Sequence, residues 1–140
     1  MNQLIYDTNL WDIKLSEDQT YFGRCVVVLK RECAALSDLT EAEMLDFLNI
    51  VRKYETLFKV KYGATMFNWT CLMNNAYKNN PPEPQMHWHC RPRYKETVVF
   101  EGVEFKDPNF AHHYERGTES NLDDKTREKL LDQLRSYLNT

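Results

Sequence analysis

Polar and apolar side chains alternate along residues 85–90, and this alternation constrains the fold more than any other feature of the sequence. Successive side chains of a β-strand point to opposite faces, so the stretch predicts a strand with two unlike faces. One face would carry nitrogen-bearing polar groups, namely Gln85, His87 and His89. The other would carry groups that can be buried, namely Met86, Trp88 and Cys90. Neighbours on the polar face would lie about 6.6 Å apart, which lets imidazole and amide groups converge on one phosphate.

Together with the pair Pro92-Arg93, this stretch resembles the motif of the histidine triad (HIT) family of nucleotide hydrolases and transferases. That motif is His-x-His-x-His-x-x, with x apolar, and Pro-Arg often follows it. Aligned on Pro92-Arg93, the sequence has Gln85 at the first position, His87 at the second and His89 at the third. The chain therefore departs from the motif at its first position. A second register, His87-x-His89-x-Arg91, is open but displaces the Pro-Arg pair by two residues.

The resemblance implies an enzyme that cleaves a nucleotide at its α-phosphate. His87 matches the family's nucleophile, which would form a covalent nucleotidyl-histidine; this requires an acceptor, such as a backbone carbonyl, on its other ring nitrogen. His89 would donate to phosphate oxygens. Gln85 can donate a hydrogen bond but cannot exchange a proton at neutral pH. Expected substrates are dinucleoside polyphosphates, as in the diadenosine polyphosphate hydrolases, or nucleoside phosphoramidates. The alternative is a nucleotide-binding module with little or no turnover.

Further binding residues are expected from the same resemblance. Family members often carry Gly-His at the start of a strand, and here Gly23-Arg24 occupies that place, so Arg24 could point a donor into the site. An upstream acidic or amide residue commonly holds the ribose hydroxyls, for which Asp18 is the candidate and Gln19 and Ser16 are rivals. Asn74, eleven residues before the first motif position, matches a site-contacting Asn or Gln. Asp18, Gln19 and Ser16 could equally be ordinary turn residues, whereas for Asn74 the functional role is favoured over that of a turn residue at the end of a strand.

The rest of the sequence predicts an α+β fold in a single domain, residues 1–140. A capping box at Thr40 and Glu43 begins a helix over 41–61, and Gly63 ends it. Leucines at helical spacing predict a C-terminal helix. A mostly antiparallel sheet of about five strands is expected from the stretches 11–15, 21–30, 64–74, 85–91 and 97–100, with a proline-rich loop over 79–84.

The composition limits the classes of molecule that the protein is expected to bind. A net charge of −3 argues against general nucleic-acid binding. The four cysteines lack C-x-x-C spacing, and the sequence shows neither a signal segment nor a membrane span, so we expect a cytoplasmic protein with no membrane partner. Resemblance implies a homodimer.

A metal site is the least favoured reading. His-x-His on a strand can ligate zinc, but no third His or Cys has the spacing to complete the set. We expect no required cofactor, although a divalent cation could accompany the nucleotide. His112 and His113 are adjacent, so they would point to different faces, and a surface location is expected for them.

Overall fold

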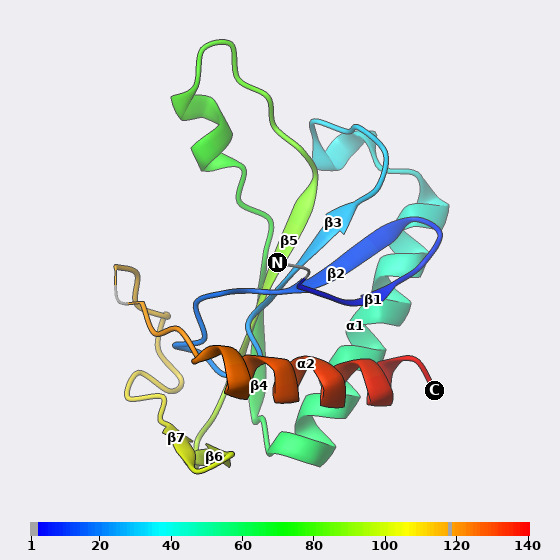
Figure 1. Ribbon diagram of the computed structural model, residues 1–140. Helices are drawn as coiled ribbons and strands as arrows, with labels where there is room; N and C mark the ends of the chain where they lie inside the picture. The colour runs from blue at the N-terminus through cyan, green and yellow to red at the C-terminus, as the bar shows by residue number, and fades with distance from the viewer. Residues whose placement is uncertain (1–2, 118) are drawn as a thin grey trace.

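Five antiparallel strands form the main sheet of the computed structural model, which describes residues 3–117 and 119–140. Their order in the sheet is β1-β2-β3-β5-β4 (Figure 1). The strands are β1 (Leu4–Asp7), β2 (Trp11–Leu15), β3 (Cys25–Leu29), β4 (Met66–Thr70) and β5 (His87–Arg93). Together with two long helices they confirm the predicted α+β class.

The predicted hairpin of 11–15 and 21–30 is present, but its second strand is shorter than expected. It begins at Cys25, which pairs with Leu15. The preceding residues form a turn in which Gly23 has φ 89°, a left-handed conformation that ends regular strand geometry. β1 was missed because its four residues show no clear alternation.

Helix α1 (Glu41–Tyr62) begins and ends where its capping signals predict. Thr40 accepts a hydrogen bond from the Glu43 amide, and the Glu43 carboxylate accepts one from the Thr40 amide. Gly63 ends the helix with φ 77°. In Figure 1 the helix runs behind the sheet, and its buried residues join the core.

The core lies between α1 and one face of the sheet, and β5 confirms the predicted alternation. Met86 and Cys90 are fully buried, and Trp88 stacks on Phe47 of α1 with ring centroids 4.7 Å apart. The strand runs from His87 to Arg93, two residues later than predicted at each end. Its pairing with β3 stops at Cys90, but its pairing with β4 continues to Arg93.

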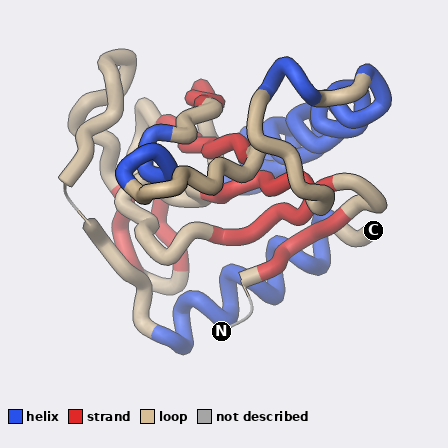
Figure 2. Tube along the Cα trace, turned by 90° about the horizontal axis from the view of Figure 1, so that it is seen from above, coloured by secondary structure: helices blue, strands red, loops and turns tan. Residues whose placement is uncertain are grey.

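Helix α2 (Asp124–Leu138) packs against β1 and α1 through a stripe of buried leucines, as the leucine spacing predicts. Figure 2 shows the strands in one layer with the two long helices beside it. Among the described residues, no helix is both long and apolar enough to cross a bilayer.

The segments around β4 and after β5 differ in detail from the predictions. β4 is five residues long instead of eleven, because the chain turns into a short 3-10 helix, Asn74–Lys78, before the proline-rich loop. The predicted strand over 97–100 is β6 (Val98–Phe100), and its partner β7 (Val103–Phe105) was missed. These two strands form a separate hairpin, from which a long loop leads to α2.

Candidate active site

His87 and His89 lie side by side on the face of β5 that points away from α1. Their ring centroids are 4.9 Å apart and the rings are nearly perpendicular. On β3 their Cα partners are Val28 and Val26, which are likewise only partly buried. Since Trp88 is anchored between them on the opposite face, the strand holds both imidazoles on a fixed backbone.

The His87 ring is oriented by a backbone carbonyl. Its Nδ1 lies 2.7 Å from the carbonyl oxygen of Gln85. A carbonyl can only accept, so Nδ1 carries the proton and Nε2 keeps a free lone pair. This is the arrangement that a nucleophilic histidine requires, and the acceptor is the backbone type that the sequence analysis suggested.

His89 is kept neutral by its surroundings. Burial lowers its pKa from 6.5 to about 4, and the nearby charges of His87, Arg24, Arg91 and Arg116 act in the same direction. Its Nδ1 is buried and has no hydrogen-bond partner among the described residues. At neutral pH, His89 therefore has a single N–H to donate and is not an imidazolium acid.

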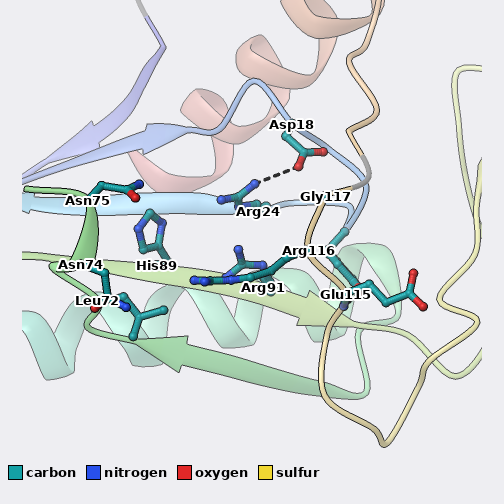
Figure 3. A pocket seen from close by; sticks show the side chains of 11 residues that line it. Asp18, Arg24, Leu72, Asn74, Asn75, His89, Arg91, Glu115, Arg116 and Gly117 are labelled. Atoms are coloured by element: carbon teal, nitrogen blue, oxygen red, sulfur yellow. Dashed lines mark hydrogen bonds and ion pairs between the residues drawn. The ribbon is translucent and has the colours of Figure 1, made fainter. Parts of the chain in front are cut away.

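A cavity of about 290 Å³ opens beside His89 (Figure 3). It is lined by three arginines and several other polar residues; those used below are Asp18, Arg24, Asn74, His89, Arg91 and Arg116. Of the residues predicted from the sequence, His89, Arg24, Asp18 and Asn74 thus meet in one cavity, and the His87 ring adjoins it through His89.

Asp18 holds Arg24 in place. One carboxylate oxygen accepts from Arg24 Nη1 at 3.0 Å, and the other accepts from the Thr20 amide and hydroxyl and from the Ser120 amide. Burial would raise the pKa of Asp18, but the bonds from Thr20 and Ser120 and the charge of Arg24 outweigh it, and the pKa is lowered. The rival candidate Gln19 is buried, and its side chain forms hydrogen bonds with backbone groups of the same turn.

The Gln85 side chain lies outside this cavity. Its Nε2 donates to the carbonyls of Leu29 and Arg31 at 2.8 and 2.7 Å, and its Oε1 accepts from the Cys33 amide at 3.0 Å. It therefore ties the start of β5 to the segment after β3. The residue reaches the site through its backbone, because its carbonyl orients His87.

Two arginines of the cavity wall, Arg91 and Arg116, were given no role from the sequence. Arg91 is buried, with its guanidinium carbon 3.8 Å from the centroid of the Tyr114 ring. Arg116 was missed altogether, because it lies in the long loop after β7, where no periodicity gives a signal. His112 and His113 are exposed, as expected, and line a separate depression beside β4. In the described part of the chain, no three His, Cys, Asp or Glu side chains are grouped to hold a metal ion.

No protein-family model and no curated protein matches this sequence. Solved structures do match. A hypothetical histidine triad nucleotide-binding protein from Sulfolobus tokodaii has a TM-score of 0.69 at 11% identity, over 99% of this chain and 85% of that chain. A histidine triad protein from Bradyrhizobium japonicum has a TM-score of 0.69 at 17% identity, over 98% and 90%. This chain has the histidine triad fold.

The histidine triad fold was predicted from the residues of β5 and is confirmed at the level of architecture. The NitFhit protein of C. elegans also matches, with a TM-score of 0.64 at 16% identity. That match covers 96% of this chain, but the chain spans only 27% of the longer protein. At these identities the likeness concerns the fold, and the chemistry has to be argued from the site itself.

Proposed function

We propose that the protein is a histidine triad enzyme that cleaves a nucleotide at its α-phosphate through a covalent nucleotidyl-His87. The observation that carries this proposal is the hydrogen bond between His87 Nδ1 and the Gln85 carbonyl, which leaves Nε2 free on the open face of the sheet. The neighbouring cavity supplies cationic and N–H donors for a phosphate, which suits a nucleotide better than a neutral ligand.

In the first step, the lone pair of His87 Nε2 attacks the α-phosphorus and the bond from phosphorus to the leaving group breaks. Negative charge that develops on the phosphoryl oxygens is stabilised by the N–H of His89 and by the guanidinium of Arg24. In the second step, water attacks the same phosphorus, the P–N bond breaks, and the nucleoside monophosphate leaves. The water proton passes to solvent, and His87 returns to its starting tautomer.

Trapping the intermediate tests the proposal directly. A panel of adenylylated and guanylylated substrates, labelled on the α-phosphate, is mixed with the protein and quenched in alkali, because phosphoramidates are acid-labile. We expect label on His87, and we expect His87→Ala to lower turnover by at least about a hundredfold while nucleotide binding stays measurable. His112→Ala is the matched control, since that histidine is exposed and lies outside the cavity. Full turnover by His87→Ala would end the proposal.

One observation favours a second candidate, a nucleotide-binding module with little turnover. Gln85 cannot supply a proton, and His89 is unprotonated at neutral pH, so neither is a strong acid for the leaving group. Gln85→His separates the two readings. If the natural site is complete, this change alters kcat/KM by less than about tenfold; if a proton donor is missing, kcat rises by about a hundredfold. We expect the first result, because the Gln85 side chain is already committed to three backbone groups.

A further inference from the structure

An apolar groove of about 550 Å³ lies between α1 and the last turn of α2. Its buried residues are Leu57 and Leu138, and its exposed apolar residues are Val60 and Tyr137. The groove and the two histidines of the candidate active site lie on opposite sides of the sheet, because α1 covers the face of β5 that carries Trp88. A ligand in this groove would therefore not contact the site.

Val60 distinguishes this groove from ordinary protein surface. Its side chain is 72% exposed, more than any other large apolar side chain in the described part of the chain. Single exposed apolar residues are common, but Val60 continues an apolar surface that Leu57, Tyr137 and Leu138 form with it. Valine is also a weaker helix former than alanine, lysine or glutamate, so the needs of α1 alone do not explain it. Contact with a partner does.

Three cationic side chains surround the groove, namely Arg52, Lys53 and Lys61, and none of the described residues that line it is acidic. Two of the cations lie over aromatic rings. Lys53 Nζ is 4.3 Å from the ring centroid of Tyr6, and Lys61 Nζ is 5.0 Å from that of Tyr137. Acidic residues outnumber basic ones by 21 to 18 in the whole chain, so this cationic rim runs against the overall composition. The groove therefore favours an occupant that is both apolar and negatively charged.

An amphipathic helix with acidic side chains fits these properties. The groove follows α1 from Asn49 to Val60, a length of about 16 Å or three helical turns. Because Val60 and Tyr137 are exposed, the groove covers only one side of its occupant. An amphipathic helix has one apolar stripe to bury, and its polar side can stay in water. Aspartate and glutamate beside that stripe would meet the three cations of the rim.

A second copy of this chain suits the groove less well. Two copies that met symmetrically here would each bring the same three cations to the interface, and like charges that face one another are unfavourable. We propose that the groove docks an acidic amphipathic helix of a partner protein. Since the histidines lie on the other side of the sheet, the partner would leave the candidate active site open to its substrate. This inference is independent of the proposed function.

A synthetic peptide tests the inference. The probe is a fluorescent helical peptide of about four turns, with leucines on one face and glutamates on both flanks of that face. Anisotropy should show saturable binding to the natural protein. Binding to Val60→Asp should be at least about tenfold weaker, because the new charge lies among apolar contacts and repels the glutamates. Val99→Asp is the matched control, since Val99 is 63% exposed on β6 and does not line the groove. Nucleotide turnover and urea unfolding should be unchanged in Val60→Asp.

Several results would overturn the inference. The probe could fail to bind, it could bind Val60→Asp and Val99→Asp equally, or a peptide with lysines in place of the glutamates could bind as well. Two further results would assign the groove to another occupant. Self-association that Val60→Asp alone abolishes in sedimentation would indicate a second copy. Binding to phosphatidylserine vesicles that Val60→Asp alone abolishes, without binding of the peptide, would indicate a membrane surface.

Discussion

Gly23 is the position at which a single methyl group should disturb both the core and the site. Its φ of 89° is left-handed, and a Cβ placed on it would lie 2.6 and 2.9 Å from the Cζ and Cδ1 atoms of Phe58. Phe58 is fully buried and packs against Tyr54 and Tyr62, with ring centroids 4.6 and 4.9 Å away, so its ring has no space to retreat. Gly23→Ala therefore combines backbone strain with overpacking.

The two contributions can be separated with Gly63, which has a similar φ of 77° but open space around its Cβ. Left-handed strain costs about 1–2 kcal/mol for a residue with a Cβ, and this applies to both glycines. Overpacking of a filled core adds about 1–3 kcal/mol, and this applies to Gly23 alone. We expect Gly63→Ala to lower the free energy of unfolding by about 1 kcal/mol and Gly23→Ala by about 3–4 kcal/mol.

Urea unfolding of both variants, followed by tryptophan fluorescence, measures the difference. Should Gly23→Ala fail to fold, the same change is made in a Phe58→Leu background, where the ring is absent. The cost of Gly23→Ala should then shrink toward that of Gly63→Ala, as a double-mutant cycle reports. Equal losses for the two glycines in the natural background would refute the reasoning, because the contact with Phe58 would then carry no energy.

Three further predictions concern charges and assembly. Because the folded-state pKa of His89, about 4, lies below its usual 6.5, the unfolded chain binds the proton first as pH falls. The free energy of unfolding should therefore fall as the pH falls from 6.5 to 4. Urea unfolding repeated across this pH range should show a fall that is smaller by about 1–2 kcal/mol in His89→Gln, a figure already reduced for the partial exposure of the ring. Arg93→Lys keeps the buried charge but loses the two-point pairing with Asp107, so the midpoint of unfolding should fall by the equivalent of about 2–3 kcal/mol. The expected homodimer is checked by sedimentation at micromolar concentration, where a monomer alone would contradict it.

The parts of the fold that could be predicted are those specified by neighbours in sequence. The capping box at Thr40 and the glycine at 63 fix α1 through bonds that span three to five residues. The alternation along β5 likewise needs no knowledge of distant residues, and it correctly placed Trp88 toward the core and the two histidines on one face.

The parts that could not be predicted depend on contacts between segments far apart in the chain. Gln85 occupies the first motif position, yet its side-chain partners Leu29, Arg31 and Cys33 lie more than 50 residues earlier. Arg116 comes to the cavity from a loop that is held by contacts with distant residues, among them the bonds from Arg93 to the carbonyls of Asn109 and His112. A side chain with several possible partners can be assigned a role only when the surrounding backbone is known.

On the face of β5 that points away from α1, the side chains change from imidazoles to guanidinium groups along the strand, so the two ends of the site differ in chemistry. The same alternation that presents His87 and His89 places Arg91 next on this face, followed by the fully buried Arg93, so imidazoles lie at one end and guanidinium groups at the other. At the guanidinium end, residues 115–117 of the loop that Arg93 anchors line the cavity. Under the proposed function, a substrate lying along this strand would be attacked at the imidazole end, by His87. The packing of the core fixes which residues of β5 face the site, because core residues and site residues alternate along the strand. The core residues cannot shift without moving the site residues as well.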